Sequence, residues 1–148
     1  MIDKLVPEKN TFKLALRCIK LWAKNRGIYS NVLGYLGGVT WAMLVARICI
    51  DNPNMPVCKL LHQFFKFYAE FKWGPSNPVL LCPLQERDSV TFQMDDKLFY
   101  KWDNAKMPII TPSFPNANSS YNIQDSTKEV ILTEFEKGAI VTKAILDG

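Results

Sequence analysis

The chain has 148 residues, 48% hydrophobic and 22% charged, with a formal net charge of +4; these values are typical of one soluble globular domain with its own core. The charged, proline-containing start argues against a secretory signal peptide. The longest apolar stretch, residues 32–46, is shorter than the roughly 20 residues that a membrane-spanning helix needs. We therefore expect a soluble protein without a membrane segment.

The positive charge is concentrated in the first third of the chain. Residues 1–50 contain eight Lys or Arg and two acids, whereas the rest contains ten Lys or Arg and twelve acids. This imbalance predicts that one end of the domain presents a surface to an anionic partner.

A first helix is predicted between Thr11 and Gly27, which suit an N-cap and a C-terminal stop. Its apolar residues recur at helical spacing; they are Phe12, Ala15, Leu16, Ile19, Trp22 and Ala23. The cations on another face are Lys13, Arg17, Lys20 and Lys24. Such a face is often only solvated, but here no acid lies three or four residues away to relieve the repulsion, and this favours an anionic partner.

A pair of glycines, Gly37 and Gly38, precedes the apolar run "VTWAMLVARICI", which predicts a second, mostly buried helix starting at one of them. Bare backbone at this point indicates either close packing of two elements or a ligand against the chain. The P-loop pattern is excluded because Val39 stands where its Lys is needed, and a dinucleotide fingerprint is excluded because no strand precedes the pair.

The remaining elements complete a mainly α, compact helical domain with one irregular or short-strand insertion. A third helix is predicted over residues 57–71, with His62 at its surface or partly buried. The segment 84–103 reads as a weak hairpin or an irregular excursion, and 106–122 as an ordered loop with extended pieces. A last helix is predicted to open with a capping box of Ser126 and Glu129. Its expected core face consists of Val130, Ile131, Phe135, Ile140, Val141 and Ile145.

Catalytic groups are scarce in this sequence. His62 is the only histidine and has no nucleophile signature near it. Asp95 and Asp96 are adjacent, so on a strand they point to opposite faces and cannot clamp one metal ion together. The four cysteines, expected to be reduced and mostly buried, show no metal-binding spacing; they are Cys18, Cys49, Cys58 and Cys82. The residues alone indicate a binding or framework domain, with no catalytic residue and no metal ligand of its own.

Several long strings carry a resemblance to a known family. The first is "LALRCIKLWAKNRGIYSNVLGYLGGVTWAMLVARIC", followed by "WGPSNPVLL", "MPIITPSFPNANSSYNI" and "STKEVILTEFEKG". In this order they resemble the central domain of eukaryotic nuclear poly(A) polymerases. The resemblance begins near Phe12 and covers the chain except for residues 85–104.

The resemblance implies that residues 1–148 are the single helical central domain of a template-independent nucleotidyltransferase, a polynucleotide adenylyltransferase that adds AMP from ATP to mRNA 3′ ends. In that family a preceding domain holds Mg²⁺ or Mn²⁺ with its carboxylates, and an RNA-binding domain follows. Neither is expected in these residues, so the isolated chain is expected to be inactive. The implied partners are ATP, the RNA 3′ end, those two domains of the same parent chain and proteins of the polyadenylation complex, in the nucleus.

Site residues follow from the same resemblance. Lys20 matches the residue that reaches the ATP phosphates, Tyr29 a nucleotide contact, and Asn31 a residue that hydrogen-bonds the adenine or the RNA end. Gly38 and Val39 are expected against the nucleotide, the glycine by its backbone and the valine by its side chain. On this view a ligand explains the bare backbone at the glycine pair better than packing.

A weaker candidate for a base or RNA contact is Thr111. Some relatives have Met six residues later, where this chain has Ala117, so no base-stacking role is transferred to that position. Two other functions stay open: a non-catalytic helical RNA-binding module that uses the basic face, and a protein-interaction bundle. RNA affinity without an added catalytic domain would favour the first of these.

Overall fold

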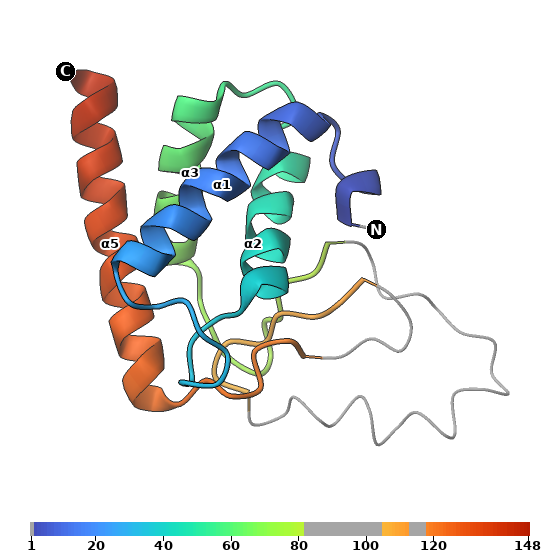
Figure 1. Ribbon diagram of the computed structural model, residues 1–148, viewed down its shortest axis with the longest axis vertical. Helices are drawn as coiled ribbons and strands as arrows, with labels where there is room; N and C mark the ends of the chain where they lie inside the picture. Colours follow the sequence, from blue (N-terminus) through green and yellow to red (C-terminus); the bar gives the residue numbers. More distant parts are fainter. Residues whose placement is uncertain (1, 82–104, 113–117) are drawn as a thin grey trace, which may run out of the picture.

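Four α-helices and a short 3-10 helix, η1 (Ile2–Lys4), make up most of the computed structural model, which describes residues 2–81, 105–112 and 118–148. The α-helices are α1 (Lys9–Asn25), α2 (Gly38–Asp51), α3 (Val57–Glu70) and α5 (Asp125–Asp147). α5 lies along α3, with which it makes the most extensive contact between two helices, while α1 packs across α2 and α3 (Figure 1). The predicted mainly α, compact helical fold is confirmed.

Aromatic side chains from all four α-helices meet in the core. Trp41 of α2 and Phe135 of α5 are fully buried, with their ring centroids 6.1 Å apart. Trp22 of α1 packs edge-on against Trp41, and Tyr68 of α3 donates a 2.7 Å hydrogen bond from its hydroxyl to the carbonyl of Leu44. The apolar stripe predicted for α1 and the aromatic residues of α3 face this cluster, so burial of their aromatic groups holds the helices together.

The face that α5 buries is narrower than the sequence predicts. Ile131 and Phe135 are buried as expected, and the next turn contributes Gly138, where a Cβ would lie 2.5 Å from Cδ1 of Phe65. The prediction is wrong for the four other apolar residues, which are exposed: Val130, Ile140, Val141 and Ile145. Within the described residues α5 packs mainly on α3, so only one side of it is covered.

Two helix starts differ from the predicted ones. α1 begins at Lys9, two residues before Thr11, with Glu8 as an N-cap that makes no side-chain capping bond. α5 begins at Asp125, and its capping box joins Gln124 to Thr127 rather than Ser126 to Glu129. The same reciprocal bonding operates two residues earlier than predicted, because Gln and Thr can also exchange such bonds.

Two other boundaries agree with the sequence. Gly27 has φ +72°, the left-handed conformation that glycine adopts readily after the end of a helix. α2 begins at Gly38, with Gly37 as its N-cap in an extended conformation.

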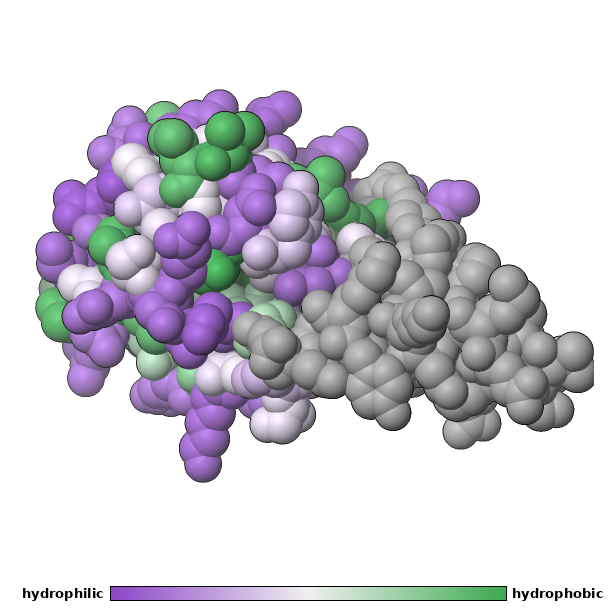
Figure 2. Space-filling model, turned by 90° about the horizontal axis from the view of Figure 1, so that it is seen from below, coloured by the Kyte–Doolittle hydropathy of each residue, from purple (hydrophilic) through white to green (hydrophobic). Residues whose placement is uncertain are grey.

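Most of the described non-helical segments gather at the end of the bundle where α2 begins, whereas the link from α2 to α3 lies at the other end (Figure 1). Isolated bridges pair Tyr29 with Leu36, Val79 with Ile109, and Ile110 with Asn118, in keeping with the extended pieces expected over 106–122. The surface seen from this end is largely hydrophilic, with separate apolar patches (Figure 2). The expected excursion at 84–103, including Asp95 and Asp96, lies outside the described residues.

The thiols are less buried than predicted within the part of the chain that the structure describes, where only Cys49 of three is buried. Cys18, Cys49 and Cys58 are free thiols, half-buried, buried and exposed respectively, whereas Cys82 lies outside it. His62 is partly buried, with its Nδ1 2.9 Å from the hydroxyl of Thr142. Among the described helices none is long and apolar enough to cross a bilayer.

Candidate functional site

The start of α2 is the point at which most of the predicted site residues converge. A Cβ placed on Gly38 would lie 2.6 Å from the hydroxyl oxygen of Tyr29 and 3.7 Å from Nζ of Lys20. A Cβ on Gly37 would lie 3.4 Å from Cβ of Asn31. Three side chains from α1 and the following segment therefore meet the glycine pair, and the packing of Tyr29 by itself accounts for the glycine at position 38.

Lys20 and Tyr29 reach this point from neighbouring elements. Lys20 lies in the last two turns of α1 and is half-buried, and Tyr29 follows in the segment that bridges to Leu36. Nζ of Lys24 lies 5.0 Å from the centroid of the Tyr29 ring, a cation–π distance. The ammonium group of Lys24 thus lies over the ring of the tyrosine, and that of Lys20 and the tyrosine hydroxyl both lie close to the Cβ position of Gly38.

Asn31 is hydrogen-bonded by Asn122, a residue that the sequence patterns did not single out. Nδ2 of Asn122 donates to the backbone carbonyl of Asn31 at 2.9 Å and lies 3.4 Å from its side-chain oxygen. The two residues are 91 positions apart, and Asn122 sits in a polar, turn-like stretch without periodicity. Its only signal in the sequence was membership of one of the strings that carry the family resemblance.

The first turn of α2 presents the other predicted contact, Val39, whose side chain is 63% exposed. The next residue, Thr40, is buried and donates a 3.4 Å hydrogen bond to the carbonyl of Ser119. Ser119 in turn bonds Ile109 through both its backbone amide and its hydroxyl. This chain of bonds ties the start of α2 to the extended segment in which Thr111 lies, half-buried and one residue after the bridge of Ile110.

The electrostatics at this end of α2 favour an anion. The first turn contains no acidic residue and has no side-chain cap, so its outermost amides have no partner within the helix and carry the positive end of the helix dipole. The basic face of α1 adds Lys20 and, exposed beside it, Lys13, Arg17 and Lys24. Within the described part of the chain none of these four cations forms an ion pair with a carboxylate.

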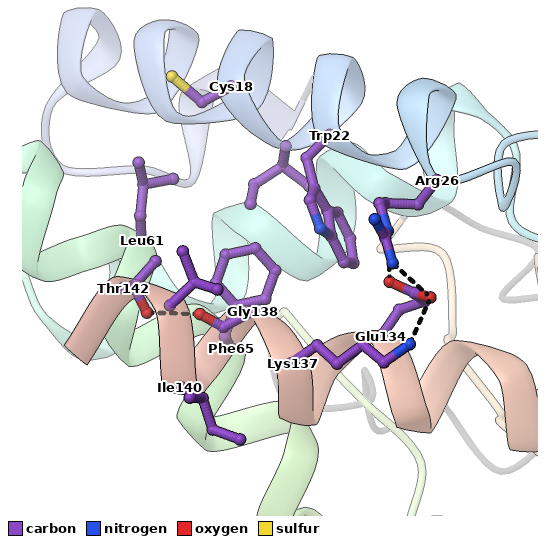
Figure 3. A pocket seen from close by; sticks show the side chains of 12 residues that line it. Cys18, Trp22, Arg26, Leu61, Phe65, Glu134, Lys137, Gly138, Ile140 and Thr142 are labelled. Atoms are coloured by element: carbon purple, nitrogen blue, oxygen red, sulfur yellow. Dashed lines mark hydrogen bonds and ion pairs between the residues drawn. The ribbon is translucent and has the colours of Figure 1, made fainter. Parts of the chain in front are cut away.

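An apolar hollow lies beside α1, lined by residues other than the predicted contacts. A groove of about 490 Å³ runs between α1 and α5 over a floor from α3 that includes Leu61 and Phe65 (Figure 3). It is lined by Cys18 and Trp22 of α1 and by the C-cap residue Arg26, spaced four residues apart, and by none of the cations of the basic face. The groove is apolar, and none of the residues that line it is a predicted contact, so we do not include it in the candidate site.

An ion pair closes one end of this groove. Arg26 donates from Nε and Nη2 to the two carboxylate oxygens of Glu134, at 2.7 and 3.2 Å, and Lys137 approaches the same carboxylate (Figure 3). The hydrogen bond from Arg26 lowers the pKa of Glu134, against the opposing effect of burial. Because Arg26 caps the C-terminal end of α1, the pair anchors the start of the segment that carries Tyr29 and Asn31.

Groups for catalysis by metal ions are missing from the described residues, in which no three His, Cys, Asp or Glu side chains gather. The site around Gly38 offers cations, helix amides, a tyrosine hydroxyl and one amide side chain. Such groups are suited to a phosphorylated, hydrogen-bonding ligand, but none of them is a carboxylate that could hold a metal ion.

Comparison with known proteins adds an independent finding. The sequence model of the family described as "Poly(A) polymerase central domain" matches residues 11–148. The chain is 49% identical to the poly(A) polymerase of Dictyostelium discoideum over 99% of its own length and 18% of that protein. It is 45% and 44% identical to nuclear poly(A) polymerases 2 and 4 of Arabidopsis thaliana, over 97% of this chain and 18% and 19% of those proteins. The chain thus spans less than a fifth of the length of these relatives.

Proposed function

Because this chain belongs to the family of poly(A) polymerase central domains, we propose that it supplies the ATP-binding and RNA 3′-end-binding surface of a polynucleotide adenylyltransferase. The observation that carries the proposal is the meeting of Lys20, Tyr29 and Asn31 at the glycine pair that starts α2. The residues that the resemblance assigned to the nucleotide lie on α1, in the segment after it and at the start of α2, and they are close to one another in the fold.

In this proposal each group has a role that its chemistry permits. Lys20 and the free amides of the first turn of α2 bind the triphosphate, since both attract negative charge. The exposed side chain of Val39 forms an apolar wall for the purine ring, and the backbone of Gly38, against which Tyr29 packs, lies beside it. Asn31 provides a hydrogen-bonding group for the base, and Tyr29 a hydroxyl beside the phosphates or the ribose.

The RNA strand is proposed to follow the basic face of α1. Lys13, Arg17 and Lys24 are exposed on the same face as Lys20, which leads the phosphate backbone toward the nucleotide. This face also supports the second candidate function, an RNA-binding module without a nucleotide site. Thr111 remains a proposed contact on the side of the base or of the RNA end.

The chemical step needs groups from outside this domain. Transfer of AMP relies on Mg²⁺ or Mn²⁺ held by carboxylates, which we assign to another domain of the same parent chain. The names of the Arabidopsis relatives support a nuclear location. The chain alone, given ATP, divalent metal and an oligo(A) primer, is expected to produce no extension.

The test uses a chimera in which this chain replaces the matching segment of the Dictyostelium polymerase. Lys20→Ala is expected to reduce kcat/KM for ATP and for competing nucleotides equally, by roughly ten- to a hundredfold, as for the loss of a charge-assisted hydrogen bond. Lys13→Ala removes the same charge two turns away and is the matched control. It should weaken RNA binding slightly and leave the KM for ATP unchanged.

Two results would contradict the proposal. Equal effects of Lys20→Ala and Lys13→Ala on the KM for ATP would show that the basic face acts only as a diffuse positive surface. If substitutions around Gly38 change neither the RNA affinity of the chain nor its ATP kinetics, the RNA-binding module is favoured instead.

A further inference from the structure

We propose that Asn122 is a positioning residue, an inference that rests on the proposed function. Asn122 turns the side chain of Asn31 so that the NH₂ group of Asn31 faces the base. Asn31 would then read a hydrogen-bond acceptor, N1 of adenine. The inference starts from the bonds between these two residues and not from either residue alone.

Asn122 is itself rigidly placed. Asn118, four residues earlier, accepts hydrogen bonds on its side-chain oxygen from the backbone amides of Ile109 and Ser120, both at 3.1 Å, and so fixes the turn. The backbone oxygen of Asn122 lies 3.3 Å from where a Cβ of Gly34 would stand. Gly34 has φ +85°, a conformation in which a side chain is strained. Backbone and side chain of Asn122 therefore both lie against the segment that carries Asn31.

The orientation of Asn31 follows from the chemistry of amides. A backbone carbonyl only accepts hydrogen bonds, so the group of Asn122 that lies 2.9 Å from the carbonyl of Asn31 must be its NH₂. The same NH₂ lies 3.4 Å from the side-chain amide of Asn31 and favours the oxygen of that amide on its side. The NH₂ group of Asn31 is thereby turned away from Asn122 and left for a ligand.

A fixed donor restricts which base atoms can be recognised. On the pairing edge of adenine N1 is an acceptor, whereas N1 of guanine carries a hydrogen and is a donor. N3 and N7 accept in both purines and cannot distinguish them. A site that prefers ATP through Asn31 must therefore direct this NH₂ to N1.

Three nucleotides tested on the chimera separate the donor from the acceptor role of Asn31: ATP, GTP and purine riboside triphosphate, which keeps N1 as an acceptor but lacks the 6-amino group. Asn31→Ala is expected to lower kcat/KM for ATP and for purine riboside triphosphate by the same factor, roughly threefold to tenfold, and to affect GTP less. A loss confined to ATP would mean that the oxygen of Asn31 meets the amino group, and would overturn the proposed orientation.

Asn122→Asp tests the positioning role. The new carboxylate accepts only, so it loses the bond to the backbone carbonyl of Asn31 and attracts the NH₂ of Asn31 instead, which turns the oxygen of Asn31 toward the base. The preference for ATP over GTP should fall at least as far as in Asn31→Ala. In a chain that already carries Asn31→Ala the same substitution should change that preference no further. Asn118→Asp is the matched control, because a carboxylate can still accept the bonds that fix the turn. It should leave the preference intact.

The outcomes distinguish the inference from the function on which it rests. If Asn31→Ala lowers the preference for ATP but Asn122→Asp does not, or if Asn122→Asp acts equally strongly with Asn31 absent, Asn122 has no positioning role. If Asn31→Ala leaves the preference unchanged, Asn31 does not recognise the base. That result overturns both the base contact in the proposed function and the positioning role of Asn122. Asn122→Ala removes the donor without adding charge and should give an intermediate loss of the preference for ATP over GTP. If Asn122→Asp melts at a much lower temperature than the unaltered chain, Asn122→Ala replaces it in every comparison.

Discussion

The hydroxyl of Tyr29 occupies the space that a side chain at position 38 would need, 2.6 Å from the site of a Cβ on Gly38. A contact this short is not accommodated without movement of the tyrosine or of the start of α2. The glycine is therefore required by a neighbour within the domain, and a bound nucleotide would meet a surface that this packing has already formed.

Gly38→Ala is expected to destabilise the domain by about 1–3 kcal/mol, the usual cost of forcing an extra methyl group into a packed site. Gly37→Ala is the matched control, since its Cβ would stand 3.4 Å from the nearest atom, Cβ of Asn31. Its cost should stay below about 1 kcal/mol, the scale of an N-cap change. Chemical denaturation followed by circular dichroism measures both values.

The same contact allows a rescue. Tyr29→Phe removes the hydroxyl and leaves Cζ of the ring 3.7 Å from the new methyl group, so the double variant with Gly38→Ala should recover most of the lost stability. Failure of this rescue would mean that Gly38 is required for a reason other than the tyrosine, such as the backbone conformation at the helix start.

Val39→Ala separates binding from folding. Its side chain is 63% exposed, so stability should change by less than about 0.5 kcal/mol. If Val39 is the wall for the purine ring, the KM for ATP should nevertheless rise a few-fold in the chimera, as expected for about 1 kcal/mol of lost apolar contact. An unchanged KM would remove Val39 from the site.

Glu134 predicts a specific dependence of stability on pH. The hydrogen bond from Arg26 lowers its pKa below the ordinary value of 4.5, so the folded state binds this proton less readily than the unfolded state. The contribution is fully present above the unfolded pKa and is lost as the pH falls from about 5 through the lower folded pKa. Glu134→Gln should lower the melting temperature at pH 7 and flatten its decline between pH 5 and 3.

The control for this prediction is Glu136→Gln, which neutralises an exposed carboxylate on the same helix. With this substitution the melting temperature should decline between pH 5 and 3 as it does in the unaltered chain. An equal flattening in both variants would assign the effect to the overall charge of the domain rather than to the pair of Glu134 with Arg26.

The thiols should react in the order of their burial. Cys58 is exposed, whereas burial raises the pKa of Cys49 to about 11, so only about a thousandth of the latter is thiolate at pH 8. Iodoacetamide followed by mass spectrometry should label Cys58 first and Cys49 only under denaturing conditions. Early labelling of Cys49 would indicate that α2 opens readily from the core.

The sequence by itself determined the helices, because local spacing and local chemistry decide them. The stripe of α1, the start of α2 at Gly38 and the stop at Gly27 depend on residues within one or two turns, and all three agree with the structure. The helix starts at Lys9 and Asp125 differ from the predicted ones because several neighbouring residues can cap a helix, and the choice between them depends on where the preceding chain is held. The apolar half of α5 was misjudged because periodicity shows which residues share a face but not whether another element covers it.

The candidate site depended on tertiary structure for its completion. The residues from Lys20 to Val39 lie within one stretch, so they could be identified as candidates from the sequence. Only the fold shows that Tyr29 fills the space above Gly38. Asn122 lies 91 residues from its partner Asn31 and has no pattern of its own. A hydrogen bond between two polar side chains in separate turns leaves no periodic trace in a sequence, and only the folded chain, by bringing the two turns together, decides that it forms.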